Sequence, residues 1–196
     1  MRRILTAVAA AAAVTAIAAA PASAKGHKPA GTIVDVAVQA SGGGTPDNNP
    51  YDYDLLVQAA LATGVADALA DPSARITLFA PNDKAFLRLV ADLTGSDPQS
   101  EAAALQTAVA ALGVDKIRNV LLYHAVVGKA LNPIEVLRTR SLTMANGGTV
   151  KVRGINLRDE TDALRDPRLV LWAINIKASN GVIHTIDRVL VPAGTV

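Results

Sequence analysis

The segment TLFAPNDKAF, residues 77–86, decides the fold because it joins a strand to a helix through one proline. Its first half is short and apolar, so we expect a strand over residues 76–80 that Pro81 breaks. Asn82 follows where the first free backbone amides of a helix need an acceptor. The helix that it opens carries its apolar residues on one face and should end at Gly95.

The two phenylalanines of the chain, Phe79 and Phe86, both lie in this segment. One falls in the predicted strand and the other on the apolar face of the predicted helix. We therefore predict that both are core anchors, and that Pro81 and Asn82 serve the architecture of the domain. Replacing a buried phenylalanine with a small residue typically costs about 3 to 5 kcal/mol.

A second informative segment, NGVIHTIDRVL, covers residues 180–190. Its first two residues, Asn180 and Gly181, are a strong turn signal. Apolar runs on both sides of that turn predict strands over residues 169–176 and 182–191.

Alternation along the second of these strands places His184 on the same face as Val182 and Ile186. A single histidine on such an apolar face is more often a hydrogen-bonded core residue than a ligand. Asp187 falls on the opposite face. We expect its carboxylate to hold backbone amides or a local cation and not to act as an acid.

Helical patterns crowd the first half of the chain and strand patterns the second. Helices are predicted over residues 33–39, 54–63, 65–70, 83–94, 101–112 and 133–137, and a further helix is predicted to begin after Asp115 as its cap. For residues 33–39 a strand is the alternative, because β-branched residues favour strands. Strands are predicted over residues 123–127, 141–144 and 149–153, the last two forming a hairpin across Asn146 and Gly147. This segregation predicts an α+β domain with a helical cluster against a largely antiparallel β structure.

The start of the chain has the three parts of a signal peptide in order: basic residues, an uncharged alanine-rich run and a small-x-small cleavage site ending at Ala24. We expect residues 1–24 to be removed and residues 25–31 to be a flexible lead-in. A retained membrane anchor is the alternative, but an alanine-rich run is only weakly apolar. Localisation is therefore predicted to be secreted, extracellular or cell-wall associated.

The rest of the composition agrees with export and excludes several classes of protein. The net charge of +2 equals the two leader arginines, so the remainder is formally neutral and shows no footprint for nucleic acid. Without cysteine there is neither a disulfide nor a lipid-anchored thiol. We expect no integral membrane anchor at the carboxyl end, and the alanine-rich, cysteine-free composition hints at a bacterial source.

The residue types also argue against catalysis. The chain has three histidines, one of them in the lead-in, and it has no G-x-S-x-G elbow, no thiol and no closely spaced His or Cys pair. We therefore predict no enzyme activity, no cofactor and no metal site. The carboxylates of Asp159, Glu160 and Asp162 are interpreted as a solvated loop, with cation binding as the weaker alternative.

Three motifs together resemble the signatures of the fasciclin domain: residues 77–86, residues 180–190, and the pair Tyr123–His124 between them. The resemblance covers residues 32–192 and leaves 193–196 as a short tail. It implies a β wedge or sandwich of mostly antiparallel strands with helices along one side. It also implies an extracellular or surface adhesion domain without a general catalytic activity.

For Tyr123 and His124 two roles remain open. The resemblance makes them candidate interaction residues, because this region has been linked to receptors in related matrix proteins. Their position between apolar residues at a helix-to-strand junction instead indicates buried groups that need only a backbone partner.

At the level of function, the resemblance implies a secreted, non-enzymatic interaction module. Its expected partners are an extracellular protein, a cell-wall or matrix polysaccharide, or another copy of the chain. The alternative is a carrier that holds a small apolar ligand, such as a lipid or haem, between helices and sheet.

Overall fold

The computed structural model describes residues 31–47 and 49–196 of the chain, so the predicted leader and nearly all of the lead-in lie outside the described residues. Within this part the chain forms seven α-helices, a short 3₁₀ helix and seven strands. The helices are α1 (Ile33–Ala40), α2 (Asp54–Thr63), α3 (Val65–Leu69), α4 (Asp83–Thr94), α5 (Glu101–Leu112), α6 (Val114–Leu122), α7 (Pro133–Arg138) and the 3₁₀ helix η1 (Leu171–Ala173). The strands are β1 (Ile76–Pro81), β2 (Ala125–Val127), β3 (Ser141–Thr143), β4 (Thr149–Arg153), β5 (Asn156–Arg158), β6 (Ile176–Ala178) and β7 (Gly181–Ile186).

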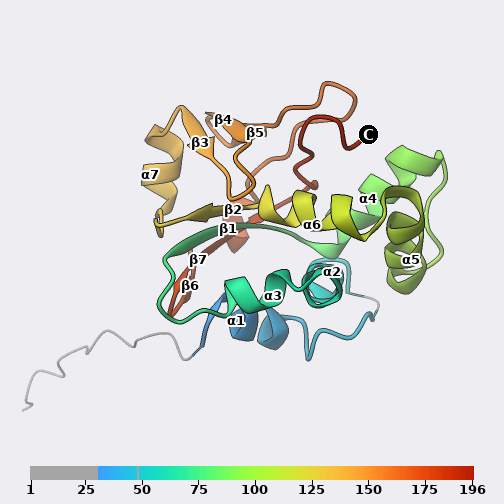
Figure 1. Ribbon diagram of the computed structural model, residues 1–196, viewed down its shortest axis with the longest axis horizontal. Coiled ribbons are helices and arrows are strands. Elements are labelled where there is room, and N and C mark those ends of the chain that lie inside the picture. Colours follow the sequence, from blue (N-terminus) through green and yellow to red (C-terminus); the bar gives the residue numbers. More distant parts are fainter. Residues whose placement is uncertain (1–30, 48) are drawn as a thin grey trace, which may run out of the picture.

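A four-stranded sheet in the order β2-β1-β7-β6 forms the middle layer. Helices α1, α2 and α3 lie on one side of it, and the three-stranded sheet β3-β4-β5 lies on the other with α7 (Figure 1). Strand β1 is buried on both faces: Leu78 and Ala80 contact the helical core, while Phe79 enters the core between the two sheets. This arrangement confirms the predicted α+β class.

The two central strands carry the two motifs, and they run parallel. Strand β1 pairs with β7 from Ile76 opposite Gly181 to Pro81 opposite Ile186. The other pairings in both sheets are antiparallel. The middle sheet is therefore mixed, a detail that local patterns did not specify because they do not identify which strands pair.

Three of the predicted helix starts are confirmed by their caps. The side chains of Thr32, Asn82 and Asn132 each accept a hydrogen bond from a backbone amide in the first turn of the following helix. The predicted cap at Asp115 is wrong, because α6 begins at Val114 and the cap position is occupied by Gly113, which has no side chain.

The strand predicted over residues 169–176 is also wrong. Leu169 makes only an isolated bridge to Ile186, the chain then turns through η1, and the strand pairing resumes in β6. The predicted strand after the turn ends at Ile186 and not at residue 191. An unbroken apolar run gives no period from which to distinguish a bent surface segment from a buried strand.

None of the helices in residues 31–47 and 49–196 combines the length and apolar character needed to span a bilayer.

Candidate functional site

Phe79 and His184 face each other where the two motifs meet in the sheet. They are partners in the register of β1 and β7, and their ring centroids are 5.8 Å apart. Both side chains are fully buried. The imidazole accepts a hydrogen bond at Nδ1 from the amide of Asn175 at 3.2 Å and donates from Nε2 to the carbonyl of Leu131 at 2.9 Å. His184 is thus a neutral core residue with both ring nitrogens engaged.

Asn180 ties the end of the sheet to the helical layer. Its Oδ1 accepts from the amide of Ile33 at 2.9 Å, and its Nδ2 donates to the carbonyls of Leu69 and Asp71, both at 2.8 Å. Next to it, a Cβ on Gly181 would collide with the backbone carbonyl of Ile76. The asparagine and the glycine therefore serve the packing of β7 against β1 and α1.

Tyr123 and His124 are both fully buried at the junction of α6 and β2. The Tyr123 hydroxyl donates to the carbonyl of Thr149 at 2.7 Å. His124 donates from Nδ1 to the carbonyl of Val120 at 2.6 Å and accepts at Nε2 from the amide of Leu190 at 2.9 Å. Neither side chain is exposed at the surface. This burial fits the structural role, one of the two roles that the sequence left open.

The hydrogen bonds of His124 require a neutral ring. The Leu190 amide needs the lone pair of Nε2, so the only ring proton sits on Nδ1. Burial of the imidazole lowers its pKa to about 4, and the hydrogen bond to the Val120 carbonyl opposes this only in part. Burial also lowers the pKa of His184.

We expect the His124 ring to stay neutral on acidification until about pH 4. The unfolded chain takes up the proton near the ordinary pKa of 6.5, so this group stabilises the fold fully above pH 6.5 and loses that contribution as the pH falls to about 4. The linked free energy is about 3 kcal/mol. Imidazole proton shifts followed by NMR from pH 7 to below pH 4 give the pKa of His124 in the folded protein, and a midpoint near 6.5 would refute the assignment.

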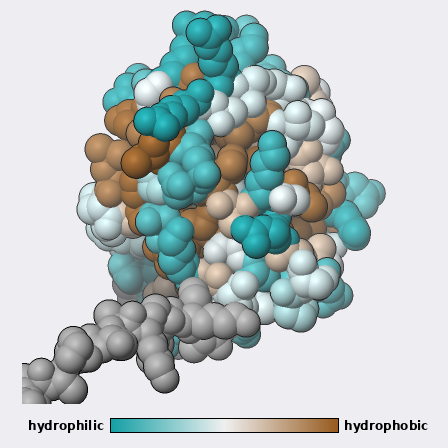
Figure 2. All heavy atoms as spheres, turned by 90° about the vertical axis from the view of Figure 1, so that its left-hand side faces the viewer, coloured by the Kyte–Doolittle hydropathy of each residue, from teal (hydrophilic) through white to brown (hydrophobic). Residues whose placement is uncertain are grey.

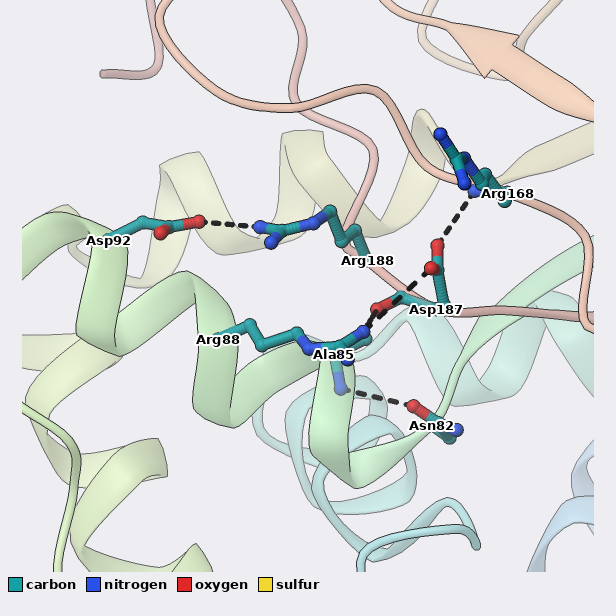
Figure 3. Close-up of polar contacts among 7 residues, drawn as sticks. All are labelled: Asn82, Ala85, Arg88, Asp92, Arg168, Asp187 and Arg188. Carbon is teal, nitrogen blue, oxygen red and sulfur yellow. Dashed lines mark hydrogen bonds and ion pairs between the residues drawn. The ribbon is translucent and has the colours of Figure 1, made fainter.

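Asp187 organises an arginine-rich surface beside α4 (Figure 3). Its Oδ1 accepts from the amide of Arg168 at 2.8 Å, and its Oδ2 lies 3.8 Å from Arg88, which also donates to the Asp187 carbonyl at 2.8 Å. The neighbouring Arg188 pairs with Asp92 at 2.7 Å. These contacts hold α4, the end of β7 and the segment before η1 together.

The same arginines line an open, polar cavity of about 630 Å³. Its walls contain five arginines and three aspartates, so positive charge is in excess. Among the described residues, Arg165 and Arg168 have no carboxylate within ion-pair distance of their guanidinium groups. The cavity therefore suits an anionic group, which arginine can bind through paired N–H donors. The lining residues are Arg88, Asn156, Arg158, Thr161, Asp162, Leu164, Arg165, Asp166, Arg168, Asp187 and Arg188.

An aromatic pair is linked to this cavity through α4, because Lys84 contacts the pair and Arg88 lines the cavity. Trp172, the only tryptophan of the chain, is 74% exposed in η1, and its ring meets Tyr51 edge-on at a centroid distance of 6.4 Å. The ammonium group of Lys84 lies 5.4 Å from the centre of the Tyr51 ring. Lys84 and Arg88 are one turn apart on α4 and so share one side of that helix. We call Tyr51, Lys84, Arg88, Arg168 and Trp172 the aromatic–arginine face.

Sequence reasoning missed this face because its members come from three separate segments. Trp172 sits in the apolar run that was predicted as a strand, where no alternation marks it as exposed. Arg88 is a single basic residue on the polar side of a helix. The sequence indicated that Asp187 holds backbone amides, and in the structure its carboxylate accepts from the amide of Arg168. This prediction came nearest to indicating the face.

Another exposed apolar group occurs on the side of the molecule that carries α7, where Figure 2 shows hydrophobic residues among hydrophilic ones. Val127, Ile134 and Leu137 are each at least 43% exposed there. By contrast, the apolar pocket between the helices and the sheet, which includes Ile33 and Leu78, holds only about 20 Å³. Ligand sites typically have about 300–1,000 Å³, so no observation on the described residues favours the lipid or haem carrier.

Carboxylates that could hold a metal ion gather at the start of α2, where the sequence analysis expected none. Asp52, Asp54, Asp83 and Glu101 are all buried, and Asp47 lies beside them. Burial, followed by the charges of Asp52 and Asp47, raises the pKa of Asp54 to about 6. Burial, together with the adjacent Asp52 carboxyl group, raises the pKa of Asp83 to about 8. Both carboxyl groups therefore release their protons less readily than an exposed aspartate does.

Comparison with known proteins gives a consistent result. Residues 52–192 match the family model of the fasciclin domain. The chain is 26% identical over 138 residues to the uncharacterized protein sll1735 of Synechocystis sp. PCC 6803, covering 70% of this chain and 88% of that protein. It also resembles a solved pair of FAS1 domains from the insect cell adhesion molecule fasciclin I, with a TM-score of 0.57 and 15% identity. That match covers 83% of this chain and 51% of the domain pair, so the chain spans about half of the solved pair.

Proposed function

The chain belongs to the fasciclin domain family, and from this membership we propose that it is an exported, non-enzymatic adhesion module that binds its partner through the aromatic–arginine face. Fasciclin domains are in general extracellular or surface modules that mediate protein interactions. The proposal adds to this general role a bacterial source, a location outside the cell, and a specific contact surface.

The exposure of Trp172 is the observation that carries the proposal. A tryptophan side chain in water forfeits a large hydrophobic contribution to folding, and here the chain leaves its only tryptophan 74% exposed. Tryptophan, tyrosine and arginine are the residue types most enriched among energetically dominant interface residues. All three types lie together on this face, with Tyr51 holding the indole edge-on.

The chemical groups on this face indicate what kind of partner it binds. The aromatic pair suits a flat or apolar group, and the unpaired guanidinium groups in the adjacent cavity suit carboxylates. A partner with both features is an extracellular protein or an acidic polysaccharide of the cell wall or matrix. A second copy of the chain also carries exposed carboxylates, for instance Asp162.

Export and domain limits complete the proposal. We place leader removal near Ala24 and the folded domain at residues 32–192, with 193–196 as a tail. Support for the early start comes from α1, which precedes the family match yet buries Ile33 and bonds its amide to Asn180. Mass spectrometry of the protein recovered from culture medium tests the cleavage site.

Replacing Trp172 with alanine should weaken partner binding by at least about tenfold while leaving the melting temperature nearly unchanged. The reason is that an exposed indole contributes to an interface and little to the core. Purified protein immobilised on beads, exposed separately to cell-wall polysaccharide and to secreted proteins, provides the binding measurement and distinguishes the two partner classes.

Leu61→Ala is the matched control, because Leu61 is an apolar residue on α2 that is 58% exposed and is not part of the aromatic–arginine face. This variant should bind like the unmodified protein. Equal binding by the Trp172 and Leu61 variants would refute the proposed face, whereas capture of no partner from either fraction would count against the adhesion module itself.

A further inference from the structure

The loop before α2 brings orphaned carboxylate oxygens into the interior. Asp54 is fully buried, and neither of its carboxylate oxygens has a hydrogen-bond partner among the described residues. The same holds for Oδ1 of Asp52, a residue that is only 6% exposed. Buried polar groups are almost always hydrogen-bonded, so three orphaned oxygens in one place require a partner of another kind.

The oxygens converge on a common space. One carboxylate oxygen from each of Asp47, Asp52 and Asp54 lies within 4.8 Å of the others, and the same is true of Asp54, Asp83 and Glu101. Two oxygens on opposite sides of a Ca²⁺ ion are about 5 Å apart, because each bond is about 2.3–2.6 Å long. The spacing therefore matches oxygens that share one such ion, with Asp54 common to both groups.

No basic side chain in residues 31–47 and 49–196 forms an ion pair with these carboxylates. The ion pairs among the described residues join Arg88 to Asp187, Arg158 to Asp162, and Arg188 to Asp92, and none of them involves the carboxylate group before α2. A buried carboxylate without a basic partner either takes up a proton or binds a metal ion. The orphaned oxygens face one another at the spacing of metal ligands, which favours a cation from solution as their partner.

We propose that a divalent cation of the calcium type binds before α2, with Asp52 and Asp54 as its central ligands and Asp47 and Glu101 beside them. Carboxylate oxygens alone suit a hard cation, and the absence of nitrogen and sulfur ligands disfavours zinc or copper. Ca²⁺ accepts irregular sets of oxygen ligands, whereas Mg²⁺ demands a near-ideal octahedron, so this set of carboxylates favours Ca²⁺.

Asp83 has a separate task in this arrangement. Both of its carboxylate oxygens accept backbone amides at the start of α2, from Asp54 at 3.1 Å and from Leu55 at 2.9 Å. It holds the helix start in place and so positions Asp54. Its carboxylate is the least available of the group for direct coordination.

The site would fasten a surface loop to two helices. Asp47 already donates its amide to Glu101 at the start of α5 at 2.9 Å, and Asp52 accepts through its carbonyl from the amide of Asp83 at 3.1 Å. A cation between these residues would close the loop that carries Tyr51. The inference rests on the carboxylate geometry alone and does not depend on the proposed adhesion role.

Calorimetric titration of the EDTA-treated protein with CaCl₂, and separately with MgCl₂, tests the proposal. We expect Ca²⁺ to bind with about one ion per chain, and to raise the melting temperature by about 5–10 °C at a concentration about 100 times Kd. Asp54→Asn should weaken Ca²⁺ binding by at least about tenfold. Asp162→Asn removes the same charge at a side chain that is 92% exposed, and it should bind Ca²⁺ like the unmodified protein.

Circular dichroism identifies an Asp54 variant that fails to fold, and Asp52→Asn then takes its place with the same expected loss. Absence of heat and of a thermal shift at millimolar CaCl₂ would overturn the proposal. So would undiminished Ca²⁺ binding by a folded Asp54 or Asp52 variant. Tighter binding of Mg²⁺ than of Ca²⁺ would overturn the calcium assignment.

Discussion

Replacing His124 with alanine should lower the free energy of unfolding by about 4 kcal/mol or more and the melting temperature by about 8–16 °C. The imidazole is fully buried and bridges the carbonyl of Val120 to the amide of Leu190. Its removal leaves two buried backbone groups unpaired, each costing about 1–3 kcal/mol, and opens a cavity in the core. Urea unfolding of the purified variant at neutral pH measures the loss.

The same variant separates the two roles that the sequence left open for the Tyr123–His124 pair. If His124 is structural, we expect the variant to bind its partner with nearly the original affinity when it is kept below its lowered melting temperature. A variant with unchanged melting and lost partner binding would show that His124 is a contact residue and that the burial argument is mistaken.

Replacing Asn180 with alanine should cost a similar amount, about 4 kcal/mol, although the side chain is small. Three hydrogen bonds of 2.8–2.9 Å connect its amide group to the backbone of Ile33, Leu69 and Asp71. With the asparagine removed, the start of α1 and the end of α3 lose their attachment to the β6–β7 turn. Chemical denaturation measures the loss, and hydrogen exchange should show faster opening of α1.

Asn119→Ala provides the control for this prediction. Asn119 is exposed on α6 and makes one side-chain hydrogen bond, in which it accepts from Asn146 at 3.0 Å. Its replacement should change the stability by no more than about 0.5 kcal/mol. Equal effects of the two substitutions would mean that the Asn180 bonds contribute little, and that α1 is held by its apolar contacts alone.

Local signals in the sequence predicted the local structure well. A proline followed by Asn82 located the start of α4, and Thr32 and Asn132 located two further helix starts, because capping depends on residues only a few positions apart. The hairpin around Gly147 followed from turn chemistry in the same way. The three motifs also identified the family, since each contains residues that the fold needs at fixed positions.

Long-range features could not be predicted in this way. Strands β1 and β7 pair in parallel, but the pattern of apolar residues within each strand does not indicate which other strand it pairs with. The carboxylate group before α2 combines Asp52 and Asp54 with Asp83 and Glu101, which lie on other helices and are brought close only by the fold. Trp172 escaped notice because hydrophobicity alone predicts burial, and its exposure follows from the turn of η1.

The parallel pair at the centre of the sheet has a consequence for the order in which the domain can form. Ile76 pairs with Gly181, so β1 has no neighbour on that side until nearly the whole chain has been synthesised. Contacts of such sequence separation make folding slow, because a long loop must close before its contacts contribute. The nascent chain therefore lacks the β1–β7 pairing at the centre of the sheet until the last part of the domain has been made.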